Sequence, residues 1–165
     1  MKFCTACGQK LGIKYEDNYK RYFCSACDSI YYENPKPCIT AVIINNRKLL
    51  LSKRLIEPGK NKWDFIGGFL ENGEHPEEGL KREVKEEIDV ALSAYHYFGI
   101  YMDTYGDKDN SVLNIVYLCK INRKPVINTK EFSELHWFDI SELPDNLAFD
   151  CMGTIISDCK KYLDI

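Results

Sequence analysis

Four of the eight cysteines form two C-x2-C pairs near the start of the chain. Cys4 pairs with Cys7 and Cys24 with Cys27, and sixteen residues separate the two pairs. Because the chain opens without the apolar run of a secretion signal, this spacing favours a tetrahedral thiolate site over two disulfides. We therefore expect these cysteines to bind Zn²⁺, with redox or disulfide chemistry as the alternative. Four sulfurs leave no place for water, so the ion would be structural.

The segment that carries these pairs, residues 1–34, is too small to fold stably without such an ion. Basic and aromatic residues interleave in its middle, around Lys14-Tyr15 and Lys20-Arg21-Tyr22. They form either a nucleic-acid surface or the tyrosine-covered core of a solvated hairpin. The other cysteines are expected to be small, buried apolar residues; they are Cys38, Cys119, Cys151 and Cys159.

A stiff, extended stretch, Asn34-Pro35-Lys36-Pro37, is the expected boundary between two domains, residues 1–34 and 35–165. After it, the hydrophobic pattern predicts strands and helices in an order that fits an α+β fold, an α-β-α sandwich with a mixed sheet. Strands are expected at 38–44, 49–53, 68–70, 94–105, 112–121 and 135–138, and helices at 76–88 and 151–163. Asn45-Asn46-Arg47 indicates a hairpin between the first two strands.

The first expected helix carries an unusual acidic edge. At 100° per residue, Leu80, Val84 and Ile88 form a stripe that should face the core. An adjacent sector is acidic and contains Glu83, Glu86 and Glu87. Like charges one turn apart destabilise a helix by a few tenths of a kcal/mol, roughly. This edge is therefore either fully solvated or built to hold cations.

Residues 68–90 decide between these alternatives because they closely resemble the Nudix box, G-x5-E-x7-R-E-U-x-E-E-x-G-U, where U is a bulky apolar residue. The matching positions are Gly68, Glu74, Arg82, Glu83, Val84, Glu86, Glu87 and Val90. Asp89 stands where the family has glycine, and Asp tolerates the left-handed turn that this glycine makes. Ile66 replaces the proline common before Gly67-Gly68. Neither departure removes a carboxylate.

The resemblance extends to about residues 37–163 and implies a Nudix-type sandwich. The cysteine-rich segment is similar to the zinc ribbon of NADH pyrophosphatases and related ribbon-bearing Nudix proteins. The resemblance to these ribbon-bearing relatives suggests that this chain forms a homodimer. The substrate signature of those NADH enzymes, S-Q-P-W-P-F-P, is absent, and the corresponding region reads Phe98-Gly99-Ile100-Tyr101-Met102-Asp103-Thr104-Tyr105-Gly106. NADH specificity is therefore not expected on this ground.

The family resemblance also implies roles for individual residues. Glu83, Glu86 and Glu87 would bind catalytic Mg²⁺ or Mn²⁺, together with the carbonyl of Gly67 or Gly68. Arg82 and Glu74 would tie the glycine loop to the helix by an ion pair. The general base would be either a helix glutamate or an acid ahead of Trp137; Glu131 is the first choice and Glu134 the second.

Candidate substrate-binding residues lie on either side of the box. Arg54, with Lys53, is expected to hold phosphates, unless both are plain surface cations. Trp63, Tyr101 and Tyr105 could stack on a base, since planar aromatic rings bind bases of any sequence, or could pack in the core. Gly67 and Gly68 complete the expected substrate-binding set.

These features indicate an Mg²⁺-dependent Nudix hydrolase that cleaves the pyrophosphate linkage of a nucleoside diphosphate derivative such as NADH, NAD or ADP-ribose. The alternatives are a nucleoside triphosphate pyrophosphohydrolase and a non-catalytic Nudix module that binds nucleotide or RNA. A net charge of −3 argues against broad attraction to nucleic acid, so an RNA partner has no support from composition. The longest apolar runs are too short to span a membrane, and a cytoplasmic location is expected.

Overall fold

The computed structural model describes residues 2–106 and 110–164. The chain folds as two compact units that divide between Asn34 and Pro35. The first unit contains a small antiparallel sheet in the order β1-β2-β3, and its strands are β1 (Gly12–Glu16), β2 (Tyr19–Cys24) and β3 (Ser29–Tyr31). Asp17 and Asn18, both left-handed, connect the first two strands in a tight turn.

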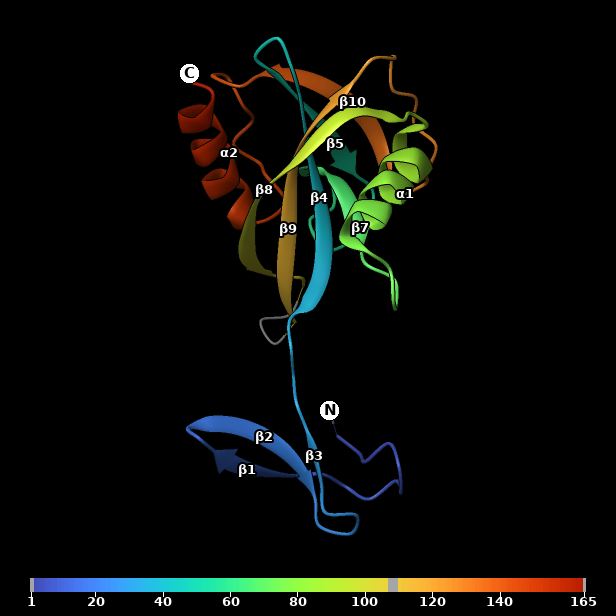
Figure 1. Cartoon of the computed structure of the whole chain (residues 1–165), viewed down its shortest axis with the longest axis vertical. Coiled ribbons are helices and arrows are strands. Elements are labelled where there is room, and N and C mark those ends of the chain that lie inside the picture. Colours follow the sequence, from blue (N-terminus) through green and yellow to red (C-terminus); the bar gives the residue numbers. More distant parts are fainter. Residues whose placement is uncertain (1, 107–109, 165) are drawn as a thin grey trace. The chain divides into compact units, whose positions relative to one another are not determined.

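The second unit is built on a mixed sheet with the strand order β10-β5-β4-β9-β8 (Figure 1). Two short strands extend it, β6 on β5 and β7 on β4. The strands are β4 (Lys36–Asn45), β5 (Lys48–Arg54), β6 (Trp63–Asp64), β7 (Ile66–Phe69), β8 (Leu92–Thr104), β9 (Ser111–Ile121) and β10 (Phe132–Asp139). Among the described strands, β4 and β9 run parallel, and the other pairs are antiparallel.

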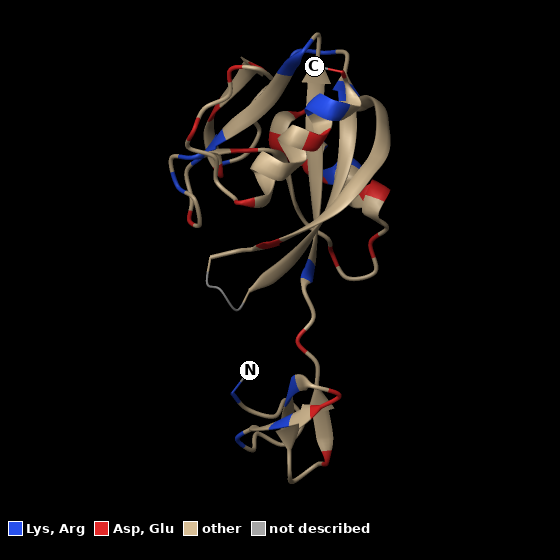
Figure 2. Cartoon of the chain, turned by 90° about the vertical axis from the view of Figure 1, so that its left-hand side faces the viewer, with Lys and Arg blue, Asp and Glu red and all other residues tan. Residues whose placement is uncertain are grey.

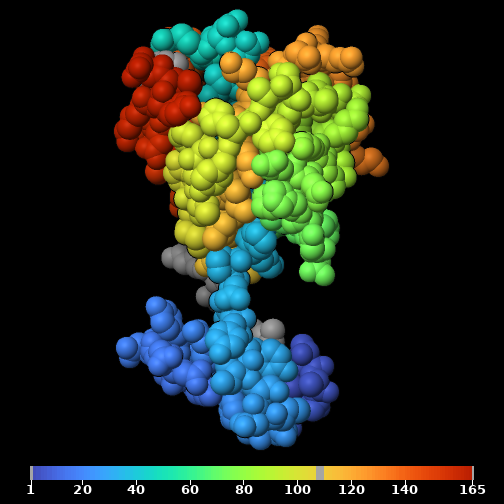
Figure 3. Space-filling view, in the orientation of Figure 1, coloured from blue at the N-terminus to red at the C-terminus, as the bar shows by residue number. Residues whose placement is uncertain are grey.

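Two helices cover opposite sides of this sheet, α1 (Pro76–Ile88) and α2 (Cys151–Tyr162) (Figure 1). The stripe Leu80, Val84 and Ile88 of α1 is fully buried in one apolar cluster, as predicted. Met152 and Ile155 of α2 lie in a second cluster on the other side. The predicted α-β-α sandwich is therefore confirmed. Figure 3 shows β8, in yellow, at the surface between the two helices.

Local sequence signals determine both ends of α1. His75 is the N-cap: its Nδ1 accepts a hydrogen bond from the backbone of Glu77, and the Glu78 carboxylate accepts one from the backbone of His75. Pro76 fits the first turn because its missing N–H needs no partner there. Asp89 ends the helix in the left-handed conformation, with φ 51° and ψ 35°. It takes the conformation expected of the glycine that it replaces.

The predicted elements differ from the observed ones mainly at their ends. Lys36 and Pro37, expected in an extended linker, already belong to β4 and pair with β9. Leu70 lies outside β7, which begins earlier, at Ile66. The two-residue strand β6 was not predicted, because it is too short to show a period. The hairpin between β4 and β5 was predicted correctly, and Asn46 and Arg47 are both left-handed in it.

The charged residues of the chain are of both signs and nearly balance, which gives the small net charge of −3. Figure 2 shows basic residues, in blue, interspersed with acidic residues, in red, on both units. Neither helix in the described part of the chain is long and apolar enough to cross a bilayer.

The left-handed Asp89 gives a test of how α1 ends. An Ala residue in this conformation costs roughly 1–2 kcal/mol, whereas Gly has no Cβ to clash. We therefore expect Asp89→Ala to be less stable than Asp89→Gly by about 1 kcal/mol or more, as measured by urea denaturation. Equal stability of the two variants would show that the left-handed cap does not form.

Candidate active site and metal centre

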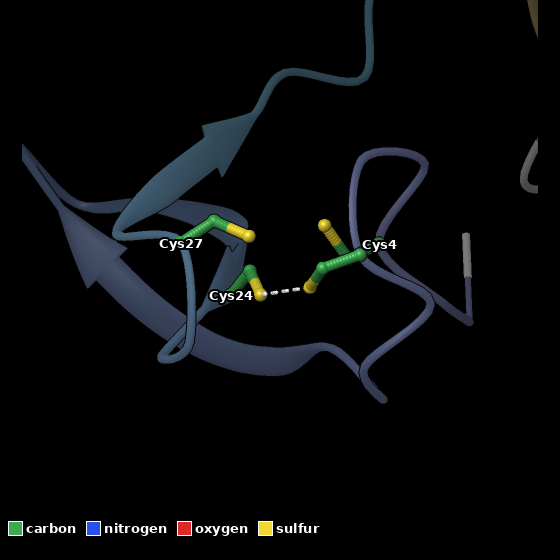
Figure 4. Close-up of side chains that lie close together, drawn as sticks. Cys4, Cys24 and Cys27 are labelled. Atoms are coloured by element: carbon green, nitrogen blue, oxygen red, sulfur yellow. Dashed lines mark hydrogen bonds between the residues drawn. The ribbon is translucent and has the colours of Figure 1, made fainter.

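The four paired cysteines lie together in the first unit. One ligand atom from each lies within 4.8 Å of all the others, and the Sγ atoms of Cys7 and Cys24 are 3.6 Å apart. Figure 4 shows the side chains of Cys4, Cys24 and Cys27 directed toward one another. All four are free thiols. This set of four sulfurs fits a tetrahedral zinc ion.

Hydrogen bonds shift the pKa values of two of these thiols in opposite directions. The Tyr31 hydroxyl lies 3.0 Å from the Cys4 sulfur and lowers the pKa of that thiol to about 6. The pKa of Cys27 rises to about 12, mainly through its hydrogen bond with Cys7. A thiolate is thus favoured at Cys4, which suits a metal-binding role.

The acidic edge of α1 lies against Gly67 and Gly68, which belong to β7 and not to a loop. The backbone N–H of Gly67 donates to Glu87 Oε2 at 3.1 Å. Gly67 has φ +147°, and a Cβ there would lie 2.0 Å from the Ile39 carbonyl oxygen. A Cβ on Gly68 would lie 2.5 Å from Glu83 Oε1. Gly67 is therefore required where β7 passes the backbone of β4, and Gly68 leaves room for the Glu83 carboxylate beside β7.

Arg82 joins the loop to the acidic edge. Its Nε and Nη2 donate to the two carboxylate oxygens of Glu74, at 2.8 and 2.9 Å. Its Nη1 donates to Glu83 at 2.8 Å and Glu86 at 3.1 Å. Nη2 also reaches the carbonyl of Phe69, at 3.1 Å. One guanidinium thus partly neutralises the acidic edge and fixes the loop that precedes α1.

The ionisation of these acids follows their surroundings. The hydrogen bonds from Arg82 and the backbone of Glu71 lower the pKa of Glu74 to about 2. The pKa of Glu87 rises to about 8, mainly through burial and also through the charge of Glu83, although the hydrogen bond from Gly67 lowers it. Burial also raises the pKa of Glu83. A positive charge nearby would therefore favour the carboxylate form of Glu87.

A cavity of about 420 Å³ opens beside this edge. Its lining includes all three glutamates and both glycines, and also Arg54 and Glu131. This volume is typical of a small-molecule site. Most of the site residues expected from the sequence therefore lie around one pocket.

Arg54 holds one wall of this pocket rather than extending free into it. Its Nη1 donates to Asp64 at 2.7 Å, its Nε donates to the carbonyl of Pro58 at 2.7 Å, and its Nη2 donates to the Tyr105 hydroxyl at 3.3 Å. The guanidinium also lies 5.2 Å from the Phe149 ring centre. Tyr105 and Phe149 stack with centroids 5.7 Å apart and planes at 20°. These contacts make a planar aromatic wall.

Two aromatic residues proposed to stack on a base lie elsewhere. Trp63 is 8% exposed, packs edge-on against Phe138 with centroids 4.8 Å apart, and is not among the described residues that line the pocket. The Tyr101 hydroxyl bonds to Asp158 of α2, at 3.1 Å. Of the three aromatics, only Tyr105 is among the described residues that line the pocket.

The acids suggested as general base also separate. Glu131 lines the pocket, and its carbonyl accepts a 2.7 Å hydrogen bond from the backbone of Leu55. Its charge also raises the pKa of Glu83 and Glu87. Glu134, by contrast, lies 3.9 Å from Lys53 on the surface.

Several pocket residues gave no signal in the sequence. Asp64 is half-buried, and desolvation raises its pKa to about 6 in spite of Arg54. Phe149 lies in a segment without a periodic pattern, and Thr40 and Asn114 lie within strands that read as apolar. Cys38 and Cys151, expected to be buried core residues, are half-buried and line the pocket, whereas Cys119 and Cys159 are buried as expected.

Comparisons with known proteins agree with both units. A family model described as the NUDIX domain matches residues 34–158, and one described as Nudix N-terminal matches residues 2–33. The resemblance inferred from the sequence is thus confirmed for both segments. A crystal structure of a NUDIX hydrolase from Nitrosomonas europaea has a TM-score of 0.71 at 28% identity, covering 99% of this chain and 91% of that one.

Two curated relatives are also similar in sequence. An ADP-ribose pyrophosphatase of Methanocaldococcus jannaschii is 32% identical over 131 residues, which cover 79% of this chain and 76% of that protein. An NAD-capped RNA hydrolase NudC of Vibrio atlanticus is 31% identical over 169 residues, which cover 98% of this chain. The match covers only 60% of the Vibrio protein.

The raised pKa of Glu87 predicts how stability depends on pH. Between the ordinary value of 4.5 and about 8, the folded state keeps a proton that the unfolded state has lost. The free energy of unfolding therefore falls as pH rises through this window. Below the window Glu87 is protonated in both states, so this loss of stability does not occur there. Without added Mg²⁺ or Mn²⁺, Glu87→Gln should lose less stability than the wild type between pH 5 and pH 8.

Urea midpoints at the two pH values measure this difference. Glu142→Gln, at an exposed position outside the pocket, is the matched control and should behave like the wild type. Equal losses in wild type and Glu87→Gln would contradict the assignment of a retained proton to Glu87.

Proposed function

Since this chain belongs to the Nudix hydrolase family, we propose that it hydrolyses the pyrophosphate linkage of a nucleoside diphosphate derivative with the help of Mg²⁺ or Mn²⁺. The observation that carries the proposal is the acidic edge of α1, which lines the same pocket as an aromatic wall. Carboxylates bind divalent cations, and the rings can stack on a planar base. The pocket can therefore hold both the diphosphate and the base of such a substrate.

The donor set fits hard divalent cations. Glu83, Glu86 and Glu87 would hold them, together with the carbonyl of Gly67 or Gly68, and all of these residues line the pocket. When bound, such ions neutralise phosphate oxygens and make water a better nucleophile. Their positive charge would also offset the unfavourable burial of the Glu87 carboxylate, whose pKa is raised to about 8.

The remaining residues of the site position groups or transfer a proton. Arg82 holds Glu74 and two of the acids in place and is a positioning residue. Glu131 is the proposed general base, because its segment is anchored to Leu55 beside the acidic edge. Its carboxylate would accept the proton of the attacking water. A helix glutamate remains the alternative base.

The substrate class follows from the relatives and from Arg54. An ADP-ribose pyrophosphatase and an NAD-capped RNA hydrolase both act on molecules in which a diphosphate joins two nucleoside-like or sugar groups. The Arg54 guanidinium is committed to Asp64 and to the aromatic wall. It is therefore poorly placed to bind a terminal phosphate, which favours ADP-ribose or NAD over a nucleoside triphosphate.

We also propose that the cysteine cluster binds one structural Zn²⁺ through Cys4, Cys7, Cys24 and Cys27. The clustered sulfurs and the lowered pKa of Cys4 support this site. A thiolate site of this kind persists in a reducing compartment, and we propose the cytoplasm as its location.

Removing one carboxylate at a time tests the catalytic proposal. Glu86→Gln and Glu87→Gln should each lower kcat for ADP-ribose by at least about 100-fold, which corresponds to roughly 2.7 kcal/mol of transition-state stabilisation. Glu142→Gln should leave kcat unchanged. Product formation is measured by mass spectrometry with Mg²⁺ or Mn²⁺, on a panel that includes NAD, NADH and nucleoside triphosphates. Undiminished turnover in both pocket variants would contradict the metal assignment.

Metal analysis tests the zinc proposal separately. The wild type should contain about one equivalent of zinc, and the double variant Cys4→Ser/Cys24→Ser should contain almost none, because its two serine hydroxyls are poor zinc ligands. Cys119→Ala, a cysteine buried in the other unit, is the control and should retain its zinc. Full zinc content in the double variant would refute the site.

A further inference from the structure

We propose that Asn114, oriented by Thr40, is a specificity residue that reads a planar substrate group carrying a hydrogen-bond donor beside an acceptor. The inference rests on the proposed function, because it assigns recognition within the same pocket. Neither residue belongs to the acidic edge of α1 or to the glycine pair of β7. Their position, burial and incomplete hydrogen bonding carry the inference.

The two residues lie on adjacent parallel strands. Thr40 is on β4 and Asn114 on β9, where Asn114 is paired in register with Cys38. Their exposed fractions are 7% and 8%, so both are more than nine-tenths buried. Both nevertheless line the cavity that holds the three glutamates. A substrate in this cavity would therefore meet an almost dry polar surface.

Core packing does not explain an amide at this position. Side chains alternate along a strand, so Asn114 shares its face with Val112, Val116 and Leu118, which are all buried. Val116 and Leu118 pack in the apolar cluster that includes α2. Asn is disfavoured in strands, and its amide costs free energy to bury unless hydrogen bonds compensate. An apolar side chain would suit the local packing better.

The protein satisfies this amide only in part. Thr40 Oγ1 donates to Asn114 Oδ1 over 3.4 Å, and Asn114 Nδ2 donates to the Cys151 sulfur over 3.7 Å. Both contacts are long and therefore weak. An Asn side chain has two N–H donors and two acceptor lone pairs. One donor and one acceptor thus remain for a ligand, and in this orientation the amide oxygen faces Thr40 and the amide nitrogen faces Cys151.

The rest of the cavity favours a flat partner. Tyr105 and Phe149 stack at 5.7 Å, and Phe69 meets Tyr105 edge-on at 5.2 Å. All three rings line the same cavity as Asn114. A planar heterocycle can lie against such rings while its polar edge meets the amide. Adenine offers an amino donor beside a ring acceptor, and the carboxamide of nicotinamide offers the same pair.

The test compares one substitution at two sites. Asn114→Leu removes the amide at similar volume, and Asn45→Leu makes the same change at an exposed position outside the pocket. For substrates that carry the group recognised by Asn114, we expect Asn114→Leu to raise KM and the equilibrium Kd about 10- to 100-fold, because a buried polar partner is lost. The thermal midpoint should not fall, and kcat should stay within about threefold of wild type.

Two ligands identify which group is read. If Asn114 reads adenine, Asn114→Leu weakens binding of ADP-ribose and NAD alike; if it reads the carboxamide, it weakens NAD only. Thr40→Val removes the hydroxyl that orients the amide. It should reduce the preference for whichever of two analogues the wild type favours, ADP-ribose against its hypoxanthine counterpart or NAD against its nicotinic acid counterpart. Asn114→Ala repeats the test should leucine disturb the fold.

Binding and turnover separate this inference from the proposed function. If the wild type cleaves the panel but Asn114→Leu and Asn114→Ala behave like Asn45→Leu in KM and Kd, the specificity role is overturned while the hydrolase stands. If the wild type binds ADP-ribose or NAD without cleaving either, the hydrolase fails, and the ratio of Kd values still decides the role of Asn114. A wild type that neither binds nor cleaves these ligands overturns both.

Discussion

Mutual repulsion among the carboxylates on one edge of α1 is the interaction on which the site depends. Glu83 and Glu87 are one turn apart and partly buried, and Glu86 lies between them in sequence. Burial raises the pKa of Glu87 to about 8, so the ionised form of this carboxylate is disfavoured by its surroundings. Arg82 offsets part of the charge by contacting Glu83 and Glu86, and it leaves Glu87 to the backbone of Gly67. Cations bound at this edge, as proposed, would relieve the remaining repulsion, which would link the stability of the helix to the proposed chemistry.

The fold holds this edge in place from both sides. The buried stripe of α1 anchors the helix on the sheet, and the backbone N–H groups of Val126 and Asn128 donate to the carbonyls of Ile88 and Glu87 at its end. At its start, the Arg82–Glu74 pair fixes the loop. Gly67 then lets β7 pass close to the backbone of β4, and Gly68 leaves room for the Glu83 carboxylate.

Local signals made much of this predictable. The bounds of α1 agree with the prediction because Pro76 and the apolar stripe act within the helix itself. Arg54 and Trp63 were harder, because whether a strand-end cation or an aromatic meets substrate depends on partners from other elements. Arg54 meets Asp64 of β6, a strand too short to predict, and Trp63 meets Phe138 of β10. Asn114 could not be singled out, since its contact with Thr40, 74 positions away in the sequence, depends on the parallel pairing of β4 with β9.

Anomalous diffraction from crystals soaked in Mn²⁺ and an uncleavable ADP-ribose analogue tests the central claim most directly. The account predicts an Mn²⁺ peak within coordination distance of the carboxylates of Glu83, Glu86 and Glu87, with the diphosphate of the analogue beside it and its rings against Tyr105 and Phe149. A fully occupied analogue elsewhere on the protein, with no Mn²⁺ peak at these carboxylates, would contradict it.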